Sequence, residues 1–195
     1  MMGDVKLLGQ TPSQTVGPFF AYGLTPAQYG FRWNSVAGPV MADETIPGQR
    51  ITVEGQVFDG KGEPITDALI EIWQADAAGR YAAQPGANAS FHGLGRCGTG
   101  TLAGGLFRFE TIKPGAAAAG EAPHLNVIVL MRGLMNHVFT RVYFADESAA
   151  NASDPVLAEV PADRRQTLVA RLVSPGRYRF DIRMQGNDET VFFDL

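Results

Sequence analysis

From residue 51 onward, frequent turn signals divide the chain into short apolar segments, and this pattern constrains the fold more than any other feature. Ile51, Val53 and Val57 lie at even spacing, as on one face of a strand, and residues 68–75 (ALIEIWQA) are apolar on both faces. Further candidate strands are residues 106–112, 124–132, 137–144, 168–173, 177–184 and 190–195. About eight short strands with little helix predict an all-β protein, a β-sandwich or a barrel.

Three other regions lack this alternation. Residues 84–105 are Gly-rich and are predicted to form a loop, and residues 151–167 are predicted to hold one or two short helical turns. Residues 1–50 contain five prolines and six aromatic residues. Because such an arm seldom forms its own core, we expect 1–50 to be an extended N-terminal arm that packs on a partner chain, and 51–195 to be the β-sandwich.

Composition narrows the function classes. The formal net charge of −4 and the pI near 5.3 have the wrong sign for general nucleic-acid binding. The single cysteine, Cys97, cannot form an internal disulfide, which favours a reducing compartment. No stretch approaches the ~18 apolar residues of a membrane helix, and the N-terminal residues do not resemble a signal peptide. The expected protein is soluble and cytoplasmic, with no nucleic-acid or membrane partner.

Few residues suggest chemistry by themselves. The sequence has three histidines and none of the usual zinc-hydrolase, P-loop or serine-hydrolase motifs. His124 and Asn126 would point to the same side of a strand, but asparagine is a poor ligand for iron or zinc, so a hydrogen-bonded His124 is the simpler interpretation. Tyr81 is most simply a hydrogen-bonded core tyrosine. On a straight strand, Arg132 would lie roughly 26 Å from His124. At that end of the strand it could pair with a carboxylate, or it could be a surface charge with no specific partner.

The order of several segments resembles the intradiol ring-cleaving dioxygenases, a family of β-sandwich enzymes with non-haem ferric iron. The segments are ALIEIWQADAAGRY (68–81), FHGLGR (91–96), FRFETIKPG (107–115) and APHLN (122–126). TPSQTVGPFF (11–20) and YRFDIRMQGNDETVFFDL (178–195) are similar to the iron-free chain of the family's two-chain enzymes. The resemblance runs from about Thr11 to the C-terminus.

In the iron-bearing chains of this family, two tyrosines and two histidines hold the iron. By resemblance, Tyr81 takes the place of the first tyrosine, Ala117 of the second, and His124 and Asn126 of the histidine pair. Glu121 stands where the family usually has an arginine that supports substrate chemistry. The resemblance therefore implies that these four positions are vestigial ligand positions, and that this chain has no catalytic residue and no metal of its own.

The resemblance also implies a partner, a cofactor and a substrate. An iron-bearing beta chain would hold the ferric iron, in a hetero-oligomer of alpha–beta pairs that oxidises a small aromatic substrate, a catechol with a carboxylate, in aromatic catabolism. The residues expected to contact this substrate are Thr15, Gly17, Pro18, Phe19 and Arg132. Gly17 would allow close backbone approach and Pro18 would stiffen the turn. Phe19 lacks the hydroxyl of the tyrosine that many family members have there.

Two alternatives remain at this stage. The chain could be a non-catalytic binding or assembly sandwich derived from the same fold, although a module that works alone would not need the aromatic arm. It could also be a stand-alone dioxygenase acting on catechol. Family members of that kind keep all four ligands and dimerise through an N-terminal helical part, which this sequence does not show.

Overall fold

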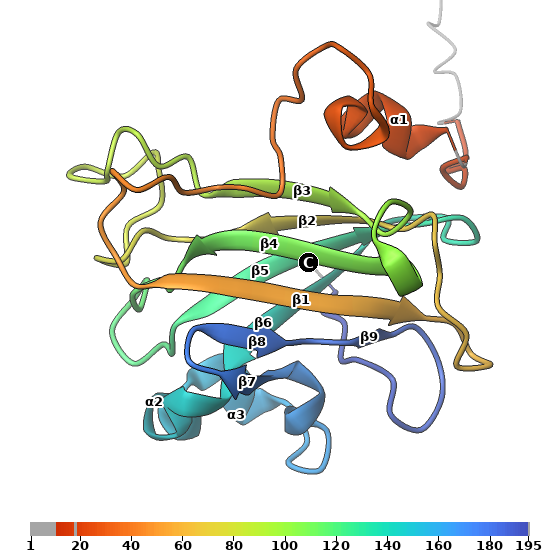
Figure 1. The fold of residues 1–195 in the computed structure, drawn as a ribbon. Helices are drawn as coiled ribbons and strands as arrows, with labels where there is room; N and C mark the ends of the chain where they lie inside the picture. The colour runs from red at the N-terminus through yellow and green to blue at the C-terminus, as the bar shows by residue number, and fades with distance from the viewer. Residues whose placement is uncertain (1–10, 18, 195) are drawn as a thin grey trace, which may run out of the picture.

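A computed structural model describes residues 11–17 and 19–194, and within them nine strands form one mixed sheet (Figure 1). The strands are β1 (Arg50–Phe58), β2 (Leu69–Trp73), β3 (Leu94–Gly98), β4 (Leu106–Ile112), β5 (His124–Leu130), β6 (Val138–Phe144), β7 (Val169–Ser174), β8 (Arg177–Arg179) and β9 (Ile182–Arg183). Their order is β3-β2-β5-β6-β7-β8-β1-β4, with β9 paired to β1. The predicted all-β class is confirmed, with only a few short helices beside the strands.

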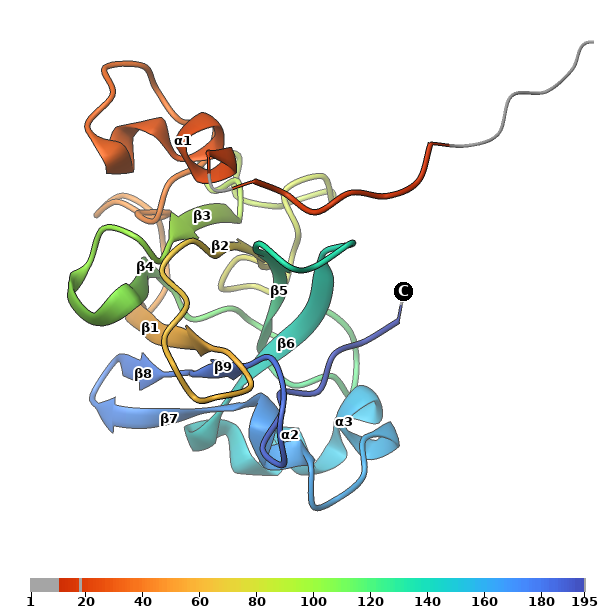
Figure 2. The same ribbon diagram turned by 90° about the vertical axis from the view of Figure 1, so that its right-hand side faces the viewer.

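The two halves of this sheet face each other across one core. Alternate residues of β1 point inward, which buries Val53 and Val57 as the sequence pattern predicts. Ile70 and Leu125, from the half formed by β3, β2, β5 and β6, pack in the same cluster. Figure 2 looks along the strands and shows them arranged around this core. The sheet is therefore folded over on itself, as in a sandwich.

The N-terminal arm covers both edges of the sheet. β3 and β4 are the two ends of the strand order. Gly38 O accepts a hydrogen bond from Arg96 N of β3 at 3.2 Å, and Pro39 O accepts one from Glu110 N of β4 at 2.9 Å. Met41 N donates to Glu110 O at 2.8 Å. Since unpaired edge strands invite pairing with other chains, residues 38–41 act as a cover for both edges.

The arm contains two short helices, α1 (Phe20–Leu24) and the 3-10 helix η1 (Pro26–Tyr29), which lie above β3 (Figure 1). Gln28 fastens η1 to the end of that strand. Its Nε2 donates to Gly98 O at 2.7 Å and to Thr101 Oγ1 at 2.6 Å, and its Oε1 accepts from Gly98 N at 2.9 Å. The side-chain amide thus replaces the peptide group of a neighbouring strand. Packing of the arm on a partner chain stays a prediction.

Gln28→Ala is expected to lower the free energy of unfolding by about 1–3 kcal/mol, because it leaves the Gly98 peptide group without these partners. Urea unfolding measures the change. Gln166→Ala, at an exposed glutamine, is the matched control and should change stability by less than about 0.5 kcal/mol. Equal shifts for the two variants would contradict the role of Gln28.

Two strand predictions need correction. β3 lies in the Gly-rich region that we expected to be a loop. Gly95 faces the arm there, and a Cβ at Gly95 would lie 2.5 Å from Met41 Sδ. The close approach of the arm therefore explains why a glycine stands where the alternating pattern of a strand would have an apolar side chain. The strand predicted at 190–195 is wrong over the described residues. Only Phe193 forms a bridge, to Phe139, and its N donates to Phe139 O at 2.8 Å.

The predicted helical turns are present between β6 and β7. They are η3 (Ala145–Glu147), α2 (Ser148–Ser153), α3 (Pro155–Glu159) and η4 (Arg165–Leu168), and a further 3-10 turn, η2 (Ala103–Gly105), precedes β4. Leu157 and Leu168 of these helices pack on Tyr143 of β6. Asp154 caps α3 by accepting from Val156 N and Leu157 N, at 2.9 and 2.8 Å. No helix in the described part of the chain is long and apolar enough to cross a membrane.

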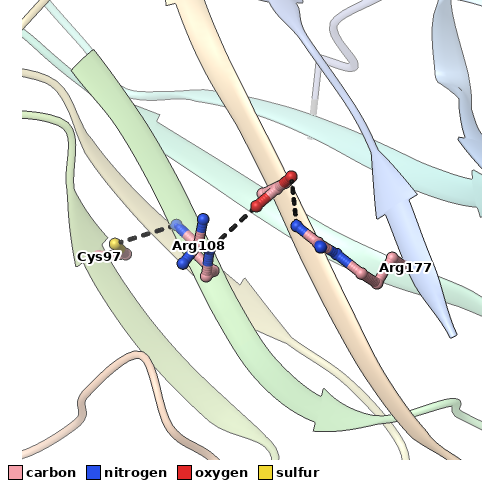
Figure 3. Close-up of polar contacts among 4 residues, drawn as sticks. Cys97, Arg108 and Arg177 are labelled. Carbon is pink, nitrogen blue, oxygen red and sulfur yellow. Dashed lines mark hydrogen bonds and ion pairs between the residues drawn. The ribbon is translucent and has the colours of Figure 1, made fainter. Parts of the chain in front are cut away.

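On the outer face of β1 and β4, ion pairs join neighbouring strands. Glu54 accepts from Arg108 Nε at 2.9 Å and from Arg177 Nη2 at 3.1 Å (Figure 3). Arg108 N donates to Cys97 Sγ at 3.4 Å. Burial raises the pKa of the Cys97 thiol, so this cysteine stays protonated and unreactive.

Candidate functional site

Three of the four vestigial ligand positions meet at one end of β5. Asn126 Nδ2 donates to the Tyr81 hydroxyl at 2.8 Å, and the Tyr81 ring stacks on Trp73 with centroids 6.1 Å apart. In the register of the sheet, Asn126 pairs with Trp73 of β2, and His124 pairs with Tyr143 of β6. These side chains therefore share the outer face of the sheet.

The fourth position, Ala117, lies on a loop that is held against the turn before Tyr81. Gly115 N donates to Asp76 O at 2.9 Å. Gly79 has φ of +78°, and a Cβ there would lie 2.0 Å from Ala116 O, so both the conformation and the close approach require glycine. The backbone brings the two loops together, but Ala117 offers only a methyl group.

His124 is almost fully buried, with 4% of its surface exposed. Its Nδ1 lies 2.9 Å from Ala122 O and must be the donor, because a carbonyl oxygen only accepts. Burial lowers the pKa of His124 and keeps the imidazole neutral, so Nε2 is the ring nitrogen that carries the lone pair. Ala122 N in turn donates to Asp154 Oδ2 at 2.8 Å, so the helix cap also fixes the segment that carries His124.

These residues do not fit a resident ferric iron. Tyr81 would have to bind as a phenolate, but burial raises its pKa, and its oxygen already accepts a hydrogen bond from Asn126. Ala117 has no ligand atom, and Asn126 points its NH2 group at Tyr81. Among residues 11–17 and 19–194, no group of three or more His, Cys, Asp or Glu side chains is placed to hold a metal ion. One neutral imidazole nitrogen cannot replace a set with two phenolates.

A second cluster lies at the opposite end of β5 and joins two of the predicted substrate contacts. Gly133 N donates to Thr15 Oγ1 at 2.9 Å, although the two residues are 118 positions apart. Arg132, next to this contact, forms an ion pair with Asp67 and keeps 62% of its side chain exposed. A hollow of about 280 Å³ lies between the arm and the loop after β5, lined by residues that include Ser13, Gln14, Val16, Leu130, Met131 and Leu134.

The remaining predicted contacts are less constrained within this chain. Phe20 N donates to Gly17 O at 3.0 Å, which makes the turn into α1, yet a Cβ at Gly17 would meet no atom within 4 Å. Nothing in this chain therefore requires a glycine there. Phe19 is 79% exposed. Pro18 lies outside the described residues.

Sequence reasoning missed Asp67, which contacts Arg132 directly. Leu69 of β2 pairs with Leu130 of β5, and the two strands are antiparallel. Asp67, two residues before Leu69, therefore lies opposite Arg132, two residues after Leu130. The alternation in each strand is visible in the sequence, but the pairing of β2 with β5 is not. Asp154 and Tyr143, which support the His124 segment, were also missed, because the pairing of β6 with β5 and the position of the α3 cap are not visible in the sequence either.

Comparisons with known proteins give the chain its family. The family model described as "Dioxygenase" matches residues 16–186. The chain is similar to the protocatechuate 3,4-dioxygenase alpha chain of Burkholderia cepacia, with 57% identity over 96% of this chain and 98% of that one. It is 43% identical to the alpha chain from Pseudomonas putida, over 98% of this chain and 99% of that one.

A solved structure supports the same family. The dioxygenase domain of a dioxygenase carbohydrate-binding protein fusion from Streptomyces sp. SirexAA-E superposes with a TM-score of 0.57 and 26% identity, covering 94% of this chain and all of that one. The chain belongs to the intradiol dioxygenase family and, within it, to the protocatechuate 3,4-dioxygenase alpha chains.

Proposed function

We propose that this chain takes part in protocatechuate cleavage by forming part of the wall of the substrate pocket of an iron-bearing beta chain. It holds no iron itself. In the proposed reaction, O2 and 3,4-dihydroxybenzoate give 3-carboxy-cis,cis-muconate. The bond between the two hydroxylated ring carbons breaks, and each of these carbons becomes a carboxylate carbon carrying one atom of O2. The chain would then be needed to recognise the substrate's own carboxylate.

The observation that carries this proposal is the hydrogen bond between Gly133 N and Thr15 Oγ1. It joins Thr15 of the arm to the loop that presents Arg132, so these two expected contacts lie on one surface. The Arg132 side chain is exposed enough to reach beyond its own chain, and a guanidinium is the side chain best suited to a carboxylate. A partner seated on this surface would place its substrate between the two segments.

The exposed aromatic residues of the arm support pairing. Phe19 and Trp33 are 79% and 60% exposed, and Phe31 stacks on Trp33 with centroids 5.0 Å apart. Large apolar side chains gathered in this way are typical of a protein interface. We therefore propose alpha–beta pairs in a hetero-oligomer. A cytoplasmic location is part of the same proposal, since the lone Cys97 is buried and forms no disulfide.

Co-expression of the tagged chain with an untagged beta chain tests the proposal. We expect the two chains to co-purify in equal amounts, with protocatechuate dioxygenase activity. The beta chain made alone should lose affinity for protocatechuate while keeping its iron. If the beta chain alone has the same KM for protocatechuate as the complex, this chain does not wall the pocket.

A further inference from the structure

Asp67 and Arg132 form a pair whose members differ greatly in exposure. Asp67 lies in the bend before β2, and the register of β2 with β5 places it opposite Arg132. The Asp67 side chain is 18% exposed, against 62% for Arg132. The carboxylate is thus a fixed group under the surface, and the guanidinium projects outward from it.

The carboxylate depends on this arginine. Asp67 Oδ2 is buried and accepts no hydrogen bond of ordinary geometry within the described part of the chain. Its ion-pair partner there is the Arg132 Nε. A buried carboxylate without a cation is costly, so Asp67 restricts the guanidinium to orientations in which Nε faces inward.

This orientation leaves the other edge of the guanidinium available. With Nε paired to Asp67, the terminal nitrogens Nη1 and Nη2 carry the other four N–H donors of the guanidinium, on a side chain that is 62% exposed. Arginine donates to a carboxylate best through two parallel hydrogen bonds in one plane. We propose that Asp67 is a positioning residue, which orients Arg132 so that its free edge receives the substrate carboxylate. The inference rests on the proposed function, in which Arg132 faces that substrate.

The first test is Asp67→Asn in the co-expressed alpha–beta complex. The asparagine keeps the size of the side chain and removes the charge, so the KM for protocatechuate should rise roughly three- to tenfold with little change in kcat. Catechol has no carboxylate, and its turnover should not change. Glu71→Gln is the matched control, because Glu71 lies on the adjoining strand and pairs with Arg96 Nε at 2.5 Å in the same way.

The second test repeats Asp67→Asn in a complex that carries Arg132→Lys. It distinguishes a positioning role of Asp67 from a merely structural one. Lysine has one ammonium group, which Asp67 and the substrate would have to share. In the Arg132→Lys background, Asp67→Asn should release the ammonium to the substrate and lower the KM for protocatechuate. The same Asp67→Asn change would then raise KM beside arginine and lower it beside lysine.

The outcomes separate this inference from the proposed function. If Arg132→Ala leaves KM unchanged in an intact complex, the proposed role of Arg132 fails. If Arg132→Ala raises KM but Asp67→Asn does not, only the positioning role fails. That role is also overturned if Asp67→Asn impairs catechol and protocatechuate equally, or if it raises KM beside lysine.

Discussion

Produced without its partner, the chain is expected to bind no stoichiometric iron and to have no dioxygenase activity toward protocatechuate. Ala117 offers no ligand atom, and the half-buried Tyr81 hydroxyl, whose pKa burial raises, is a neutral phenol that accepts a hydrogen bond from Asn126. Metal analysis and visible spectroscopy of the purified chain measure this. Tyrosinate–iron absorbance at one iron per chain would contradict the prediction.

A variant that restores the missing ligand types makes the negative result interpretable. Ala117→Tyr combined with Asn126→His supplies a second tyrosine and a second histidine at the positions given by the family resemblance. It also removes the amide that donates to Tyr81. We expect this double variant to gain iron-dependent absorbance when it is loaded with ferric iron. The wild-type chain, loaded in the same way, is expected to stay colourless.

Arg132→Ala in the alpha–beta complex is expected to raise the KM for protocatechuate about tenfold or more. Removing a charge-assisted contact with an anionic substrate costs roughly 1–3 kcal/mol of binding, and about 1.4 kcal/mol corresponds to one decade. The visible spectrum of the complex should persist, because the iron is proposed to lie in the other chain. Steady-state kinetics of the purified complex measure the change.

Catechol is the internal control for this variant, since it lacks the carboxylate. Its weak turnover should barely change in Arg132→Ala. Equal losses for both substrates would show that Arg132 holds the interface together and does not recognise the carboxylate. If the KM for protocatechuate stays within twofold of the wild-type value while the complex is intact, Arg132 is a surface charge at the end of its strand and does not bind the substrate.

The strands could be predicted wherever alternation marks a buried face. In β1, the inward positions Ile51, Val53 and Val57 carry the signal themselves. β3 could not be predicted in this way, because its inward positions are Gly95 and Cys97, and the arm packs too closely on Gly95 for a larger side chain. The C-terminal segment has a strand-like composition but pairs with β6 only at Phe139, and pairing is a property of the tertiary structure.

The candidate site was predictable only in part. The resemblance located Tyr81, Ala117, His124 and Asn126, and three of these four side chains do share one face. Composition and spacing alone favoured ordinary hydrogen-bonded roles for Tyr81 and His124. Asp67 was not predictable, because its importance depends on the register of two strands that are more than 50 residues apart in the chain.

The cover formed by residues 38–41 has a consequence for biosynthesis. Arg96 and Glu110, which hold Gly38 and Pro39, are made 58 and 71 positions later than those residues. At about 5–20 residues per second, the ribosome needs roughly 4–14 s to synthesise the later partner. The arm therefore emerges early and cannot be seated until β4 has left the ribosome. A pause in translation before Glu110 leaves both the arm and the edge of β3 exposed to chaperones and to other nascent chains.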